Sequence, residues 1–229
     1  MILWLTLNAL LLLVAYLLGS IPSGYWAGRM LKGIDIREHG SKSTGATNVL
    51  RTVGTVPAIA VLLADIFKGV VAIALVNWAY TSAAFQSYSP TTVQPSLWLP
   101  WMITLAGAAA LLGHSKSILL NFTGGKSVAT SLGVLLAMNW MVGLGTLGVF
   151  LLVLAVTRIV SISSISGAIA VSGLMFFMGQ PLPYLLFAIA GGTYVILRHR
   201  ANIQRLLAGT EPRLGQTIPE SDAAPQSGT

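Results

Sequence analysis

Long apolar runs separated by short polar segments fill the sequence, and they predict membrane-spanning helices. The first three runs cover about 2–27, 56–80 and 97–112. A spanning helix needs about 20 mostly apolar residues, so each run predicts one span. Because no basic residue precedes the first run, we expect a spanning helix there rather than a signal peptide. Pro22 predicts a kink or break near the end of this run.

The apolar region 127–157 is 31 residues long, which is too long for one ordinary span. Asn139 in its middle and the glycines that follow predict two short helices joined by a tight turn. Two more apolar runs end near Met178 and near Leu197. The pattern therefore predicts seven spans in total.

The distribution of charge supports this number of spans and gives an orientation. If the N-terminus lies outside, every Lys and Arg lies on or beside the cytoplasmic side, and the outer loops carry none. Treating 127–157 as one span would move Arg158 and the RHR cluster at 198–200 outside, against the positive-inside rule. We therefore expect an all-α polytopic membrane protein with seven transmembrane helices, the N-terminus outside and the C-terminus cytoplasmic.

Composition also indicates a membrane protein. The chain is 55% hydrophobic and 8% charged, whereas a soluble domain has about 25% charged residues. The net charge of +7 could suggest nucleic acid, but the positive charges are confined to short loops, so we expect no nucleic-acid partner. We expect one integral-membrane domain over 1–215. The tail 216–229 contains Pro, Ser, Gln and Gly, which predicts disorder on the cytoplasmic side.

The polar segment Gly40–Arg51, GSKSTGATNVLR, has the composition of an anion site. Glycines let backbone N–H groups converge on an anion. Hydroxyls and the amide of Asn48 can donate to oxyanions, and Arg51 can fork onto a phosphate. An ordinary polar loop rich in turn residues is the alternative. We interpret the segment as one wall of a phosphate site at the edge of a membrane.

A second polar segment, His114–Lys126, ends in a GGK sequence that resembles the end of a nucleotide-binding P-loop. That motif needs a Gly five positions before its second Gly. The position is Leu120, so we reject nucleotide binding. Gly124 and Gly125 can still present backbone N–H groups at a helix start, and Lys126 adds a full positive charge.

Two later polar segments are open to two interpretations each. The patch 158–164 contains an arginine and three serines, which could bind an anion or cap the next helix. The segment 198–205 could be a basic helix attracted to anionic lipid. His199 and Asn202 within it share a helix face, which would point at the bundle if the helix continues the last span.

Asp65 and Lys68 lie three residues apart inside an apolar run. Charge within a membrane is costly and usually faces the bundle interior. The pair could take part in catalysis, or it could be an ion pair that anchors the helix.

Missing motifs restrict the mechanism. The sequence has no HExxH motif, no Cys/His cluster and no cysteine, so we expect no metal site and no cofactor. No His is followed by Asp five positions later, and no Gly-x-Ser-x-Gly elbow is present. Cationic anion sites without an evident base or nucleophile indicate catalysis by positioning and charge stabilisation.

Six blocks, in order, resemble the bacterial acyl-phosphate:glycerol-3-phosphate acyltransferase family over nearly the whole chain up to about Gly215. They are GSIPSG at 19–24, DIREHGSKSTGATNVLR at 35–51, DIFKG at 65–69, GHSKSILLNFTGGKSVAT at 113–130, RIVSISSI at 158–165 and RHRANIQRLLAGTE at 198–211. The resemblance implies a seven-helix enzyme of the bacterial inner (plasma) membrane, with its active site on the cytoplasmic face.

The resemblance also implies a reaction. A fatty acyl group would pass from a long-chain acyl phosphate to the 1-hydroxyl of glycerol 3-phosphate, giving lysophosphatidic acid and inorganic phosphate. This is the first acylation step of phospholipid biosynthesis. The two substrates and the lipid bilayer would be the partners, and we expect a monomer. In the family a substrate phosphate is thought to take the hydroxyl proton, so no protein base is required.

Residue roles follow from the matching blocks by position. The acyl-phosphate pocket would be lined by Ser41, Ser43, Thr47, Gly124 and Gly125. Glycerol 3-phosphate would be bound and oriented by Arg51, Lys126, Ser164, His199 and Asn202. The catalytic set would be Ser41, Lys126, Ser164, His199 and Asn202.

Two positions depart from the commonest family pattern. The first loop usually reads GSGN where this chain has GSKS, which places Ser43 where Asn is common. The second usually reads GGKG where this chain has Ser127. Serine can still donate to a phosphate, so we expect altered contacts with activity retained.

Two other functions also suit a small membrane bundle. One is a transporter or channel for a phosphorylated metabolite, and the other is a non-catalytic, lipid-binding assembly factor. Transport needs a polar path through the midplane, whereas the polar residues here gather at one face. No inverted repeat is visible between the halves. We therefore expect an enzyme.

Overall fold

The structure is a computed structural model that describes residues 1–216 and is all-helical over this range, which confirms the predicted class. The long helices are α1 (Ile2–Ser20), α4 (Thr55–Thr81), α6 (Pro95–Ser115), α8 (Trp140–Thr157), α9 (Val160–Phe177) and α10 (Leu182–Arg198). The short ones are α2 (Ser23–Lys32), α3 (Ala46–Thr52), α5 (Ala83–Gln86), the 3-10 turn η1 (Ile118–Leu120), α7 (Val128–Met138) and α11 (Arg200–Leu207). The predicted disordered tail, apart from its first residue, lies outside the described residues.

Two predicted interruptions are confirmed. The chain breaks at Pro22, between α1 and α2, because proline has no N–H to continue a helix. Asn139 separates α7 from α8 and caps α8. Its side-chain oxygen accepts the N–H groups of Met141 and Val142 at 3.0 and 3.1 Å.

Within residues 1–216, five helical segments are long and apolar enough to cross a membrane: Ile2–Lys32, α4, α6, α8 and α9. The helices α7 and α10 are apolar but shorter, with 11 and 17 residues. The chain is therefore a multi-pass membrane protein by the character of its helices, and the number of seven spans stays a prediction.

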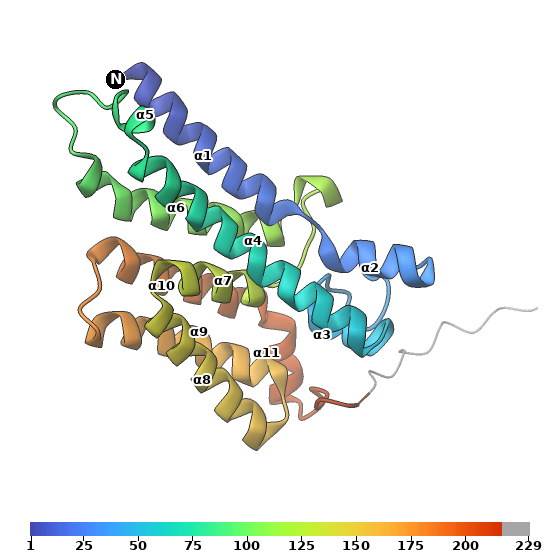
Figure 1. Cartoon of the computed structure of the whole chain (residues 1–229). Helices are drawn as coiled ribbons and strands as arrows, with labels where there is room; N and C mark the ends of the chain where they lie inside the picture. Colours follow the sequence, from blue (N-terminus) through green and yellow to red (C-terminus); the bar gives the residue numbers. More distant parts are fainter. Residues whose placement is uncertain (217–229) are drawn as a thin grey trace, which may run out of the picture.

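The helices pack as two groups joined by α7 (Figure 1). Helices α1, α4 and α6 contact one another, as do α9 with both α8 and α10, and α7 packs against α4 and α8. Small residues allow α4 and α7 to approach closely. A Cβ at Gly69 would collide with the carbonyl oxygen of Thr130, and one at Gly133 with that of Ile66.

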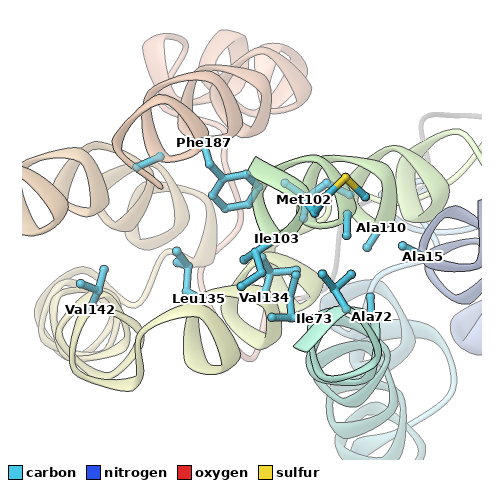
Figure 2. Close-up of a cluster of buried hydrophobic side chains, with 14 of the residues drawn as sticks. Ala15, Ala72, Ile73, Met102, Ile103, Ala110, Val134, Leu135, Val142 and Phe187 are labelled. Carbon is cyan, nitrogen blue, oxygen red and sulfur yellow. The ribbon is translucent and has the colours of Figure 1, made fainter. Parts of the chain in front are cut away.

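The core lies in the middle of the bundle, where α4, α6, α7 and α10 meet. Its side chains include Ile73, Ile103, Val134, Leu135 and Phe187, each at most 5% exposed (Figure 2). The polar segments that join the helices are left outside this core. Those at 33–45, 116–127 and 199–216 gather at one end of the bundle, where they form a cavity with the neighbouring helices.

Candidate functional site

A cavity of about 680 Å³ lies between the two helix groups. Its walls are apolar and come from α4, α7, α8, α9 and α10. Its polar end collects side chains from four separate segments of the chain, and these are Ser41, Ser43, Thr47, Arg51, Lys126, Ser164, His199, Asn202 and Glu211. The structure therefore brings together eight of the ten site residues predicted from the sequence, all except Gly124 and Gly125.

Asn48 holds the first polar segment in shape. Its side-chain oxygen accepts the N–H of Ser41 at 2.8 Å. Its Nδ2 atom lies within 3.0 Å of three carbonyl oxygens, those of Ile36, His39 and Ser43. The sequence suggested that this amide could donate to an oxyanion, but at 1% exposure it serves the loop itself. A buried amide with backbone partners fixes the loop so that its hydroxyls face the cavity.

Arg51 brings a positive charge to the cavity from α3. It follows Thr47 by one helical turn, so the two side chains share a face, and both line the cavity. Its Nη2 atom reaches the carbonyl oxygen of Pro212 at 3.5 Å. Burial lowers the pKa of Arg51, but a guanidinium remains protonated in proteins. The first polar segment thus meets the C-terminal segment at this residue.

Lys126 is the first member of a chain of polar contacts across the site. Its Nζ donates to Asn202 Oδ1 at 2.6 Å, and Asn202 Nδ2 donates to Glu211 Oε1 at 2.6 Å. Glu211 Oε2 in turn accepts from Arg205 Nε at 2.7 Å. Burial lowers the pKa of Lys126 to about 8, with Glu211 opposing this effect. The ammonium is therefore held in place and poorly solvated, ready for an anion.

His199 lies at the junction of α10 and α11 and is 3% exposed. Its Nδ1 is 2.8 Å from the carbonyl oxygen of Val195. A carbonyl can only accept, so Nδ1 carries the proton and Nε2 is left as an acceptor. Burial lowers the pKa of His199 to about 4. The ring is therefore neutral at pH 7 and can accept a hydrogen bond from a hydroxyl.

Two serines of the site use their hydroxyl protons within the protein. Ser164 Oγ donates to the carbonyl oxygen of Val160 at 2.8 Å. Ser127 Oγ donates to that of Leu111 at 2.8 Å. Ser127 also has φ of 63°, a left-handed conformation in which glycine is unstrained. This conformation accounts for the glycine that the family pattern commonly has here, and Ser127 gives its proton to α6 rather than to the cavity.

The GG pair of the second polar segment lies behind the cavity surface. The N–H of Gly125 donates to the carbonyl oxygen of His114 at 3.2 Å. Arg198 Nη2 donates to the carbonyls of Gly124 and Gly125 at 3.3 and 3.0 Å. A Cβ at Gly125 would collide with His114 Nε2. The pair thus positions Lys126, and its predicted contact with acyl phosphate stays a prediction.

A buried polar cluster (Asp65, Lys68 and His114) lies beside the cavity. Lys68 Nζ is 2.9 Å from Asp65 Oδ1, 2.9 Å from the carbonyl oxygen of Ile21 and 2.9 Å from His114 Nδ1. Ser23 Oγ donates to Asp65 Oδ1 at 2.8 Å. Asp65 and Lys68 therefore form a buried ion pair, and a part for the pair in catalysis stays a prediction. The cluster fixes α4 and α6 to the break between α1 and α2.

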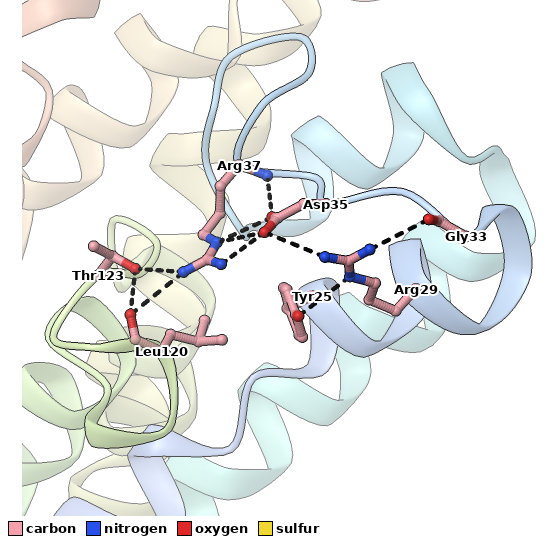
Figure 3. A network of polar contacts seen from close by, with 7 residues as sticks. All are labelled: Tyr25, Arg29, Gly33, Asp35, Arg37, Leu120 and Thr123. Atoms are coloured by element: carbon pink, nitrogen blue, oxygen red, sulfur yellow. Dashed lines mark hydrogen bonds and ion pairs between the residues drawn. The ribbon is translucent and has the colours of Figure 1, made fainter.

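A second network, outside the cavity, joins the loop 33–45 to the second polar segment, 114–126 (Figure 3). Arg37 Nε and Nη2 donate to the Asp35 carboxylate at 3.0 and 2.6 Å, and Nη1 donates to Thr123 Oγ1 at 3.0 Å. The guanidinium lies 5.1 Å from the centre of the Tyr25 ring. The hydrogen bond from Arg37 lowers the pKa of Asp35 to about 2. The network sets the distance between the two segments.

Sequence reasoning missed Glu211 and His114 as cavity residues. Glu211 is in the last matching block, but it follows Asn202 by nine residues in a segment without periodicity. The only available signal was a single acidic residue in a basic segment. His114 opens the second polar segment and could have been noted for that reason. Within residues 1–216, no group of three or more His, Asp or Glu side chains is placed to hold a metal ion.

Comparison with known proteins identifies the family. A sequence model described as glycerol-3-phosphate acyltransferase matches residues 9–209. A glycerol-3-phosphate acyltransferase from Nostoc sp. is 67% identical, over 94% of this chain and 95% of that protein. The one from Acaryochloris marina is 62% identical, over 94% of this chain and 96% of that protein.

Solved structures agree. The crystal structure of PlsY, an integral membrane glycerol 3-phosphate acyltransferase, in its glycerol 3-phosphate form has a TM-score of 0.76 and 36% identity, covering 91% of this chain and 96% of that one. The lysophosphatidic acid form has a TM-score of 0.73 and 34% identity, covering 91% and 95%. These findings favour the enzyme over a transporter or an assembly factor. The chain belongs to the glycerol-3-phosphate acyltransferase family of integral membrane enzymes.

Proposed function

We propose that this enzyme transfers a fatty acyl group from acyl phosphate to the 1-hydroxyl of glycerol 3-phosphate, giving lysophosphatidic acid and inorganic phosphate. The observation that carries the proposal is the cavity itself, because a cationic, hydrogen-bonding end continues into apolar walls. A donor with a charged phosphate and a fatty chain matches both parts. The enzyme would act as a monomer built from a single domain over 1–215.

The polar end offers cations and hydroxyl donors to the two substrate phosphates. Lys126 and Arg51 line it from different segments, and Ser41, Ser43 and Thr47 add hydroxyls. Arg binds phosphate oxygens in a bidentate manner, whereas Lys acts as a point charge. Ser41, Ser43 and Thr47 would hold the acyl phosphate, and Arg51 and Lys126 would hold glycerol 3-phosphate and the charge that develops during transfer.

His199, Asn202 and Ser164 would orient the acceptor. His199 Nε2 can accept a hydrogen bond from a glycerol hydroxyl, because Nδ1 already carries the ring proton. Asn202 connects Lys126 to Glu211 and so fixes the cation relative to the hydroxyl. Holding two reactants in one geometry removes much of the entropic barrier to their reaction.

The reaction needs no protein nucleophile. The 1-hydroxyl oxygen attacks the carbonyl carbon of the acyl phosphate, and the bond from that carbon to the phosphate oxygen breaks. The hydroxyl proton leaves with the phosphate. Lys126 stabilises the negative charge that accumulates on the departing phosphate, which is the electrostatic form of catalysis.

The experiment that tests this function uses purified protein with palmitoyl phosphate, with and without glycerol 3-phosphate, and with palmitoyl-CoA as a parallel donor. Phosphate release and lysophosphatidic acid, identified by mass spectrometry, are measured together. We expect equal amounts of the two products from palmitoyl phosphate and none from the thioester. Transfer from palmitoyl-CoA, or phosphate release without an acylated product, would contradict the proposed donor.

The orientation is the second part of the proposal. We place α1, α4, α6, α7, α8, α9 and α10 across a bacterial plasma membrane, with the N-terminus outside and the cavity's polar end at the cytoplasmic face. The basic residues of the polar segments support this placement.

The chain has no cysteine, so single cysteines can report its topology. We expect Ser87→Cys, in the exposed loop after α5, to react with an impermeant maleimide in cells whose outer surface is accessible. Ala208→Cys, exposed after α11, should react only after the membrane is opened. The reverse pattern would overturn the orientation.

A further inference from the structure

The cavity runs inward from the polar end and stops at three apolar side chains. On α10 the cavity-lining residues continue from His199 to Phe187, on α9 from Ser161 to Val171, and on α7 inward to Leu135. We call Phe187, Val171 and Leu135 the cavity floor. Their exposed fractions are 5%, 4% and 4%.

The distance to the floor matches an elongated apolar ligand. Phe187 precedes His199 by 12 residues, and a helix rises about 1.5 Å per residue, so the floor lies about 18 Å from the polar end. Beyond it the bundle is filled. Met175 and Val142 are both 0% exposed, and Tyr184 packs against the same core.

Phe187 is the largest side chain of the floor, and its position is fixed by a glycine. A Cβ at Gly107 on α6 would lie 2.8 Å from Val134 and 3.0 Å from the Phe187 ring, so the ring rests against bare backbone. Figure 2 shows the ring between α10 and the buried side chains of α6 and α7. The ring cannot move aside without displacing this packing, because protein interiors are close-packed.

We propose that Phe187 sets the longest acyl chain that the enzyme accepts, by ending the cavity at the floor. This inference rests on the proposed function, in which the apolar part of the cavity takes the acyl chain of the donor. Chains that end above the ring bury all their methylene groups. Longer chains would have to displace the ring or leave methylene groups outside.

Two variants on the same face of α10 should shift the preference in opposite directions. Phe187→Ala removes the ring and opens the cavity toward Gly107 on α6, against which the ring rests, so the optimum moves to longer chains. Gly191 lines the cavity one turn nearer the polar end, and a Cβ there would lie 3.6 Å from Leu111 and 3.8 Å from Phe187, which are ordinary contacts. Gly191→Leu therefore ends the cavity earlier and favours shorter chains.

The measurement is kcat/KM for a series of saturated acyl phosphates that differ in chain length, with glycerol 3-phosphate saturating. Each buried methylene group is worth about fourfold in affinity. For a chain two carbons above the wild-type optimum, we compare kcat/KM with its value at the optimum, and we expect this ratio to rise about sixteenfold in Phe187→Ala. Phe177→Ala, at an 86% exposed position outside the cavity, is the matched control and should leave the profile unchanged.

Each outcome decides the inference. Opposite shifts in the two α10 variants support it. Profiles that superimpose on the wild type overturn it, because the chain would then leave the cavity sideways into lipid. Should Phe187→Ala be recovered poorly, Phe187→Leu gives a smaller opening at lower packing cost, and an unchanged profile there has the same meaning. Failure of the proposed function looks different, since the wild type would use no acyl phosphate of any length.

Discussion

Asn202 shows how much of the site depends on a single side chain. It accepts from Lys126 and donates to Glu211, and it is 5% exposed. Because both of its polar atoms have partners, its orientation fixes the distance between an ammonium and a carboxylate that have no direct contact. A buried amide with both polar atoms satisfied is held rigidly. The site is therefore preorganised before substrate arrives.

Removal of the Lys126 ammonium should abolish most turnover. We expect Lys126→Ala to lower kcat by about 10²–10³-fold, the usual loss when one charge-stabilising donor is removed. Arg51→Ala should lose most activity for the same reason. Lys116→Ala, at an exposed position outside the cavity, is the control and should keep its activity. Suppose that either site variant inserts into the membrane, elutes normally during purification and turns over at a near-wild-type rate. The residue would then not act by charge stabilisation.

The pH dependence of the free enzyme should report Lys126. Its pKa of about 8 lies below the ordinary value because the site is buried, so the ammonium loses its proton as the pH rises through about 8. The kcat/KM for glycerol 3-phosphate, which reports the free enzyme, should therefore fall above this pH. His199, with a pKa of about 4, stays neutral between pH 6 and 8, so it causes no change in kcat/KM over this range. Lys126→Arg keeps its charge, so its residual activity should show no alkaline fall.

The lowered pKa of Lys126 also makes the free energy of unfolding depend on pH, and the direction of this dependence follows from the shift. Between pH 8 and the ordinary lysine pKa near 10.5, the unfolded chain holds a proton on this residue that the folded site has released. The contribution of Lys126 to the free energy of unfolding therefore rises with pH across this window. Activity and stability should thus change in opposite directions there.

At the scale of elements, the apolar pattern predicted the long helices and two of their breaks but not α3. The basic helix suggested over 198–205 is present as α11, which is separated from α10 at His199. Pro22 and Asn139 mark the breaks because one lacks an N–H and the other caps a helix. The helices α3 and α11 have only 7 and 8 residues and no apolar run. Short helices are marginal without tertiary support. Asn48 ties α3 to the loop before it, and Val49, at 0% exposure, packs it against Ala58 and Val61 of α4.

The turn before α7 is another element whose role depends on a tertiary contact. A Cβ at Gly125 would collide with His114 Nε2, so Gly125→Ala must displace either the ring or the loop that carries Lys126. A displacement of about 1 Å can cost a hundredfold in rate, and we expect a loss of about that size in kcat. Gly148→Ala is the matched control, because a Cβ there meets nothing within 4 Å. Full activity in Gly125→Ala would show that the loop tolerates the shift.

At the scale of the whole molecule, the site exists only because the segment 41–51 meets the segment 199–211. The six sequence blocks indicated which segments carry polar residues, and the family resemblance indicated that they meet. Neither showed that Glu211 would accept a hydrogen bond from Asn202, or that Arg51 would reach the carbonyl of Pro212. Contacts of this kind depend on how the helices pack, and no local pattern encodes them. The sequence therefore gave too small a part in the site to the C-terminal segment.

Two truncations test how much of this segment the site needs. Ending the chain after Gly215 keeps Glu211 and the bond from the N–H of Leu214 to the carbonyl oxygen of Arg158, 2.7 Å long. Activity should stay within about twofold of the full chain, as for surface changes in general. Ending it after Gly209 removes the carboxylate that pairs with Arg205. The remaining buried cations then repel one another without compensation.

We expect the shorter protein to lose most activity and to unfold at lower temperature in detergent. Glu211→Gln in the full chain separates charge from chain length, since it keeps the hydrogen bond from Asn202 while removing the negative charge. If Glu211→Gln is impaired like the shorter truncation, the carboxylate is the essential part. If it is fully active while the shorter truncation is not, the segment acts through its backbone contacts with Arg51 and Arg158. Full activity after removal of everything beyond Gly209 would show that the site is complete without its C-terminal segment.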